Sequence, residues 1–230
     1  MSSSSLAKLS RPRTARAVAR ERLFERFDAA REQHQAVFVV APPGAGKTTA
    51  VASWLNARRI PGIWFQVDAG DAELPAFFSY LRRGAQSYLR KGQRSLPLLT
   101  PEYLGDVPGF SRRFFRGLFA QLPRGAVLVL DNYQEVSDTA PLHELIAAAV
   151  AEVPPESALI LVSRSSPPAC FARVLANDNT TTFHWDDLRL SLAEALAIGQ
   201  LRVAVERTAI ERLHAQSEGW AAGFVLLLER

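Results

Sequence analysis

The chain has 230 residues, of which 48% are hydrophobic and 22% are charged, a balance typical of a globular protein with one α/β domain and a small appendage. Its single cysteine, Cys170, excludes an internal disulfide and a multi-cysteine zinc site. No apolar run reaches the ~20 residues needed to cross a bilayer, and a secretory hydrophobic segment is missing at the start. We therefore expect a cytoplasmic protein.

Positive charge is concentrated near the beginning of the chain, and the net charge is +4. Residues 1–10 include four consecutive serines, and we predict a disordered lead-in there. The arginines that follow are mixed with Val18, Leu23 and Phe24, so this stretch fits either an ordinary amphipathic helix or a nucleic-acid-binding segment. These arginines are Arg11, Arg13, Arg16, Arg20, Arg22 and Arg26.

Short apolar runs alternate with longer amphipathic stretches through most of the chain. Runs of Val, Ile and Leu without polar alternation favour strands that are buried on both faces, as in a parallel sheet covered by helices. Five strands are predicted at 36–40, 62–67, 126–130, 158–162 and, from a weaker pattern, 180–185. Helices are predicted between them at 47–58, 74–89, 111–122 and 140–152. This order predicts a doubly wound α/β fold with a five-stranded, mostly parallel sheet flanked by helices.

The pattern changes after Trp185, where only helices follow. They are predicted at 191–200, 206–216 and 220–229, and Ser191 with Glu194 has the spacing of a capping box. We therefore predict a domain at 11–187 and a small helical subdomain at 188–230. The last helix is apolar and needs a covering partner, which favours a fragment of a longer protein.

The segment Ala41-Pro-Pro-Gly-Ala-Gly-Lys-Thr48 matches the P-loop pattern, with alanine in place of the first glycine. Gly44 and Gly46 allow successive N–H groups to point into one concavity, and the following helix adds its positive dipole end. Lys47 would reach the β- and γ-phosphates, and the Thr48 hydroxyl would bind Mg²⁺. The motif predicts a P-loop NTPase that binds a purine nucleoside triphosphate through Pro43, Gly44, Ala45, Gly46, Lys47, Thr48 and Thr49.

Asp131 directly follows the strand at 126–130 and is the predicted magnesium-holding acid; the alternative is an aspartate that caps a turn. Asn132 stands where many hydrolytic P-loop proteins place a second carboxylate, and an amide can orient water but cannot accept its proton. Glu135 is either a substitute base or a solvated loop residue. Slow hydrolysis is therefore expected.

Arg164 ends the next strand and completes the predicted catalytic set with Lys47 and Asp131. A cation at this position can sense the γ-phosphate and stabilise its charge. The alternative is an exposed arginine without a role in binding.

The order of these motifs resembles the nucleotide-binding module of MalT-type (LuxR-family, large ATP-binding) transcriptional activators, which are STAND P-loop ATPases. The resemblance covers nearly everything from Lys8 to Leu228. Besides the P-loop, it rests on Lys8-Leu-Ser-Arg-Pro12, Val18-Ala-Arg-Glu-Arg-Leu23, Trp64, Val67-Asp-Ala-Gly-Asp71, Leu128-Val-Leu-Asp-Asn-Tyr133, Leu161-Val-Ser-Arg164, Asp187-Leu-Arg-Leu190 and Glu218-Gly-Trp-Ala-Ala-Gly223.

The resemblance implies further roles. Val18, Arg20 and Glu21 would lie against adenine and ribose, and Arg164 would be a sensor arginine on the strand between those that carry the P-loop and Asp131. The segment Glu218-Gly-Trp-Ala221 would stand where related proteins carry a Gly-x-Pro that closes over the nucleotide; the alternative for Trp220 is core packing.

In the family, bound ADP keeps the module closed, whereas an inducer and ATP open it for self-association. DNA is bound by a separate domain behind a sensor, and both are expected to lie outside this chain. The resemblance thus implies ATP/ADP and Mg²⁺ as ligands.

Three hypotheses follow. The first is a nucleotide-dependent switch module of a transcriptional regulator. The second is a turnover enzyme, either a stand-alone P-loop ATPase or a small-molecule kinase, for which Arg82-Arg83 and Arg112-Arg113 are the only lid candidates. The third is a nucleic-acid motor, which needs arginine fingers that the sequence does not identify.

Overall fold

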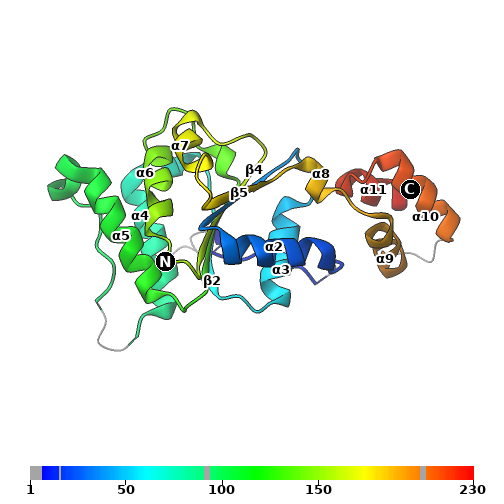
Figure 1. Cartoon of the computed structure of the whole chain (residues 1–230), viewed down its shortest axis with the longest axis horizontal. Coiled ribbons are helices and arrows are strands. Elements are labelled where there is room, and N and C mark those ends of the chain that lie inside the picture. The colour runs from blue at the N-terminus through cyan, green and yellow to red at the C-terminus, as the bar shows by residue number, and fades with distance from the viewer. Residues whose placement is uncertain (1–6, 16, 91–93, 203–205) are drawn as a thin grey trace.

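The computed structural model describes residues 7–15, 17–90, 94–202 and 206–230. A five-stranded parallel sheet lies between two layers of helices, and a bundle of three further helices extends from one side (Figure 1). The predicted fold class is confirmed, and the sheet is parallel throughout.

The strands are short and run in the order β2-β3-β4-β1-β5. Their bounds are β1 Ala36–Val40, β2 Gly62–Gln66, β3 Val127–Asp131, β4 Ala158–Ser163 and β5 Thr180–Phe183. β1, β3 and β4 are almost fully buried because helices cover both faces, which explains their unbroken apolar sequences. All five strands agree with the predicted segments to within two residues at each end.

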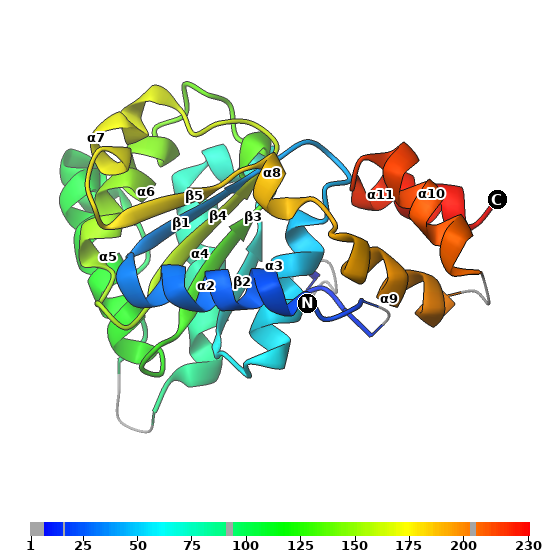
Figure 2. The ribbon, with the colours of Figure 1, turned by 45° about the vertical axis from the view of Figure 1, so that its right-hand side comes forward.

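The helices cover the two faces of the sheet unequally (Figure 2). α2 and α3 lie on one face, and α4, α5 and α6 lie on the other. The helices are α2 Glu21–Gln33, α3 Lys47–Ala57, α4 Leu74–Ala85, α5 Val107–Gln121, α6 Leu142–Ala149, α7 Ala172–Leu175, α8 Trp185–Leu188, α9 Leu192–Arg202, α10 Arg207–Ser217 and α11 Ala221–Leu228. Among the described residues, none of these helices has the length and apolarity that crossing a membrane requires.

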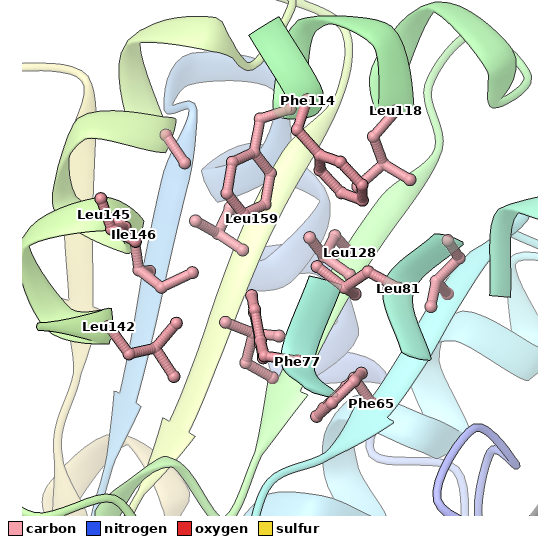
Figure 3. Packing of buried hydrophobic residues seen from close by; sticks show 14 of the residues in the cluster. Phe65, Phe77, Leu81, Phe114, Leu118, Leu128, Leu142, Leu145, Ile146 and Leu159 are labelled. Carbon is pink, nitrogen blue, oxygen red and sulfur yellow. The ribbon is translucent and has the colours of Figure 1, made fainter. Parts of the chain in front are cut away.

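The core under α4, α5 and α6 is rich in phenylalanine (Figure 3). Phe78 is fully buried, and its ring meets those of Phe110 and Phe114 edge-on, with centroids 5.0 and 4.8 Å away. Edge-to-face pairs of this kind add stabilisation beyond the burial of area. This layer fixes the sheet from the face that does not carry the P-loop helix.

Helix α5 begins four residues before its predicted start. The Asp106 side chain accepts a hydrogen bond of 2.8 Å from the Gly109 N–H, and Pro108 occupies the first turn. An aspartate cap followed by proline is a helix-start signal. The apolar pattern alone placed the start too late.

The three C-terminal helices have their own small core, which contains Leu190, Ala195, Ile210 and Phe224. Leu188, only two residues before Leu190, packs instead with α2 and α3. We propose on this basis that the domain at 11–187 and the subdomain at 188–230 meet close to the predicted boundary.

The predicted disordered lead-in at 1–10 needs a correction in its last residues, whereas residues 1–6 lie outside the described part. Lys8 lies 2.7 Å from an oxygen of Asp68 and 2.8 Å from an oxygen of Asp71. Asp71 is fully buried, and the Lys8 carbonyl accepts a hydrogen bond from the Gln66 N–H at the end of β2. Lys8 is therefore held on the domain because it neutralises a buried carboxylate.

Replacing Lys8 should reveal the free-energy cost of burying the Asp71 carboxylate without a partner. Burial raises the pKa of Asp71, and Lys8 opposes this shift. We expect Lys8→Met to lower the free energy of unfolding at pH 7 by about 3 kcal/mol, measured by urea denaturation, because a buried charge loses its partner. In the variant the pKa of Asp71 should lie further above its value in the unfolded chain, so the native state binds a proton more readily and the deficit should shrink as the pH falls from 7 towards 4.

Arg124→Met is the matched control. Arg124 pairs with Glu156 at the surface, where its own side chain is 92% exposed, so its loss should leave the urea midpoint unchanged. A Lys8→Met deficit that is absent, or that is equal at pH 7 and pH 4.5, would contradict the role assigned to Lys8.

Candidate functional site

The carboxyl ends of three neighbouring strands meet at one edge of the sheet. β4 lies between β3 and β1, so Arg164 follows the strand that separates Asp131 from the P-loop. This is the strand position that the family resemblance implied for a sensor arginine. Crevices at the carboxyl ends of parallel strands are the usual ligand sites of α/β sheets.

The P-loop runs from the end of β1 into α3 and has the backbone of an anion-binding nest. Gly44 has φ +75° and Gly46 has φ +85°, both in the left-handed region, and α3 begins at Lys47. Such turns direct N–H groups into a concavity next to the positive end of the helix. Ala45 is fully buried, and its N–H donates to the Pro42 carbonyl at 3.3 Å within the loop.

The Lys47 ammonium group folds back over its own loop. Its Nζ donates to the Ala41 carbonyl at 2.6 Å and to the Pro42 carbonyl at 3.0 Å. Burial lowers the pKa of Lys47, the Asp131 carboxylate opposes that shift, and Arg164 adds to it. The lysine is thus held within the electrostatic reach of both other predicted catalytic residues.

Thr48 and Asp131, the predicted magnesium-site residues, are in direct contact. The Thr48 hydroxyl donates to an Asp131 carboxylate oxygen at 3.0 Å, and the Asn132 N–H donates to the same oxygen at 3.0 Å. Burial raises the pKa of Asp131, and these two donors together with Lys47 oppose the shift. A hydroxyl and a carboxylate at this separation are the oxygen donors that Mg²⁺ prefers in phosphate sites.

Arg164 is linked to the turn that follows Asp131. Gln134 accepts a hydrogen bond of 2.9 Å from the Arg164 backbone N–H and donates one of 3.0 Å to Glu135. The Arg164 guanidinium lies 3.5 Å from the Glu135 carboxylate. Gln134 was not predicted from the sequence, and no spacing rule would have found it.

Two cavities adjoin at the P-loop and share Gly44, Gly46 and Thr49 in their walls. One has a volume of about 370 Å³ and a polar lining of Lys47, Thr48, Asn132, Gln134, Glu135 and Arg164 with part of the P-loop. The other has a volume of about 510 Å³ and is mainly apolar. Its walls come from α2 and the segment before it, from α3, and from α9 and α11 of the subdomain.

The segment that was expected against adenine and ribose is divided by the structure. Val18 and Arg20 line the apolar cavity, but Glu21 does not. The Glu21 carboxylate pairs instead with Arg58, just after the end of α3. The predicted contact of Glu21 with adenine or ribose gains no support from the cavity lining and stays a prediction.

Arg20 also has a partner that the sequence did not reveal. Its guanidinium lies 3.1 Å from the Glu194 carboxylate, and both side chains are more than 90% buried. It also donates to the carbonyls of Leu188 and Arg189, at 2.9 Å each. Arg20 therefore joins the wall of the apolar cavity to the beginning of the helical subdomain, and Glu194 serves it as well as the predicted capping box.

Trp220 is not a core residue, since it is 40% exposed. Its indole N–H donates to the Pro43 carbonyl at 3.1 Å, and the Ala222 N–H donates to the Gly44 carbonyl at 3.0 Å. The segment that the resemblance placed over the nucleotide thus touches the P-loop itself.

Comparison with curated proteins identifies relatives along almost the whole chain. It is 26% identical over 226 residues to the HTH-type transcriptional regulator MalT of Cronobacter sakazakii, and 29% identical over 227 residues to that of Serratia proteamaculans. Each alignment covers 96% of this chain but only 24% of the relative. The predicted resemblance to the MalT-type module is confirmed, whereas no protein-family model matches the chain.

Solved structures support the same fold. A STAND protein with a tetratricopeptide repeat sensor from Pyrococcus horikoshii superposes with a TM-score of 0.66, at 16% identity over 96% of this chain and 31% of that one. A Walker-type ATPase of Pyrococcus abyssi has a TM-score of 0.61, at 17% identity over 95% of this chain and 69% of that one. These two likenesses confirm the P-loop ATPase fold.

The P-loop lysine gives the most direct test of the site. Lys47→Ala should weaken the binding of Mg-ATP by about 100-fold, because a charge-assisted contact to phosphate is lost. Isothermal titration measures the affinity, and Arg58→Ala, just after the end of the same helix, is the control, since Arg58 does not line either cavity. Equal affinities for Lys47→Ala and the parent chain would contradict the role of this segment as a nucleotide-binding P-loop.

Asp131 should act through the metal. We expect Asp131→Asn to bind nucleotide in EDTA as the parent does, but to lose most of the gain in affinity that Mg²⁺ provides. Because the pKa of Asp131 is raised, protons should begin to compete with Mg²⁺ at a higher pH than for an ordinary aspartate. A variant that loses affinity equally with and without Mg²⁺ would show that Asp131 has another role.

Proposed function

We propose that this chain, a relative of MalT-type transcriptional regulators over nearly all its length, is an ATP/ADP-binding switch module with slow or no intrinsic hydrolysis. The observation that carries the proposal is the pair of adjoining cavities at the P-loop. One is polar, and the other is mainly apolar with walls from both the sheet domain and the helical subdomain. The relatives are named HTH-type transcriptional regulators, which suggests that the switch acts on transcription.

The polar cavity supplies the groups that a triphosphate needs. Backbone N–H groups of the P-loop and the Lys47 ammonium would bind phosphate oxygens, and Arg164 would stabilise charge on the terminal phosphate. Thr48 and Asp131 fit the hydroxyl and carboxylate positions of a Mg²⁺ site, where the ion would neutralise phosphate charge. The apolar cavity would hold the base beside Val18 and Arg20.

Slow hydrolysis follows from the residues beside Asp131. Asn132 has no proton-accepting group for an attacking water. Glu135 is the nearest alternative base, and its carboxylate is already engaged by Gln134 and faces Arg164. Because these contacts occupy the Glu135 carboxylate, we expect nucleotide retention rather than rapid turnover.

Switching would use the connection between the sheet domain and the subdomain. Arg22 donates to the Arg189 carbonyl at 3.1 Å, and Arg26 pairs with Asp187 at 2.8 Å. Together with Arg20 and Glu194, they hold the linker between α8 and α9. We propose that ATP and ADP favour different placements of α9–α11 about this linker, because the terminal phosphate is the only group that distinguishes them.

The remaining predictions concern the longer relatives, of which the chain spans 24%. Self-association in the ATP state, an inducer and DNA binding through a separate domain are proposed on the resemblance. The kinase alternative lacks support from the lid candidates. Arg82 donates to Ser95 and Arg113 pairs with Asp106, and neither lines the two cavities at the P-loop.

The nucleotide that remains with the purified chain, together with its turnover, tests the proposal. We expect denaturation to release about one ADP per chain, identified by ion-exchange chromatography, and the refilled protein to hydrolyse ATP far below about one per second. The Lys47→Ala variant, purified in parallel, should release almost none.

An empty site with turnover of many per second would show that the chain is an enzyme and not a switch. Turnover that rises only with an added small-molecule acceptor would indicate a kinase, and turnover that rises with DNA would indicate a nucleic-acid motor.

A further inference from the structure

Two different parts of the molecule donate hydrogen bonds to carbonyl oxygens of the P-loop. Lys47 bonds the carbonyls of Ala41 and Pro42. The next two, of Pro43 and Gly44, are bonded by the subdomain, through the Trp220 indole N–H and the Ala222 backbone N–H. We call these last two hydrogen bonds the loop contact.

The loop contact is built into the geometry of α11. Ala222 lies in the first turn, where helix N–H groups have no partner within the helix, so its N–H is free for the Gly44 carbonyl. The indole of Trp220 lies against Gly223, where an added Cβ would come within 2.4 Å of the ring. The fit requires glycine at 44 as well, because a Cβ there would lie 2.7 Å from the Ala222 Cβ.

From these contacts we infer that Trp220 is a positioning residue for the phosphate-binding loop, so that phosphate binding and the docking of α11 are coupled. The inference rests on the proposed nucleotide function. In a planar trans peptide the C=O and the following N–H point in opposite directions. Holding the Pro43 carbonyl towards Trp220 therefore directs the Gly44 N–H away from α11, where an anion can accept it.

The coupling is reciprocal. If the loop contact prepares the loop for phosphate, then phosphate must strengthen the loop contact by the same factor. This role differs from closure over the base, because it acts on the loop backbone and needs no nucleoside. A probe that carries phosphates alone should therefore reveal it.

The experiment uses Mg-tripolyphosphate, which lacks base and ribose, and the whole chain. Trp220→Phe keeps an aromatic ring but removes the indole N–H, and should lower the affinity for tripolyphosphate by about 2- to 10-fold, the loss of one hydrogen bond. Gly223→Ala should do the same by displacing the indole, although alanine is the better helix former. Trp185→Phe is the matched control, since Trp185 contacts Arg189 and does not line either cavity at the P-loop.

A second readout separates positioning from a merely structural role. In the parent chain, tripolyphosphate should slow amide hydrogen exchange in the peptide 219–224 while leaving 194–200 of α9 unchanged, and this protection should be reduced in Trp220→Phe. The melting temperature of free Trp220→Phe should match that of Trp185→Phe.

The outcomes are distinct. Tripolyphosphate binding that is unchanged in Trp220→Phe, or that leaves exchange at 219–224 unaltered, would overturn the inference alone. A parent chain that binds neither tripolyphosphate nor ATP would overturn it together with the proposed function.

Discussion

The orientation of the P-loop backbone is the constraint on which the rest of this molecule depends. A loop that offers its N–H groups to an anion must turn its carbonyl groups elsewhere, and buried or half-buried carbonyls need donors. Lys47 supplies donors to two of them, and Trp220 and Ala222 supply donors to the next two. The sheet holds one end of the loop through β1, and α3 holds the other. The sheet domain and the helical subdomain, the two lobes of the chain, therefore both contact this one short turn.

The charged groups around the P-loop are connected to one another by contacts and electrostatic interactions and do not act independently. Asp131 draws the Thr48 hydroxyl and faces Lys47, and Arg164 approaches from the strand between. The Gln134–Glu135 turn links Arg164 back to the strand that carries Asp131. A change in the polar cavity at Arg164 would thus reach β3 and β4 together, while the Arg20–Glu194 pair connects the apolar cavity to the subdomain.

Much of the fold and part of the site could be predicted because their signals are local. Unbroken apolar runs identified four of the five strands, a weaker pattern identified the fifth, and the P-loop with Asp131 and Arg164 followed from strand ends. What the sequence could not reveal depends on contacts between distant residues, such as Arg20 with Glu194 or Lys8 with Asp71. The Glu21–Arg58 pair was missed for the same reason, since only the packing of α2 against α3 brings Arg58 to Glu21. Trp220 carried a motif signal, but its partner is a backbone carbonyl, which leaves no trace in a sequence.

The apolar cavity has walls from both lobes, with Val18 and Ala50 on one side and Val225 and Leu226 on the other. Neither lobe alone supplies all of its walls. If a base occupies this space, it contacts both lobes at once, so separation of the lobes would remove part of its contacts and shorten its residence time. The lifetime of the bound state would then depend on the packing between the lobes as well as on the chemistry of the phosphates.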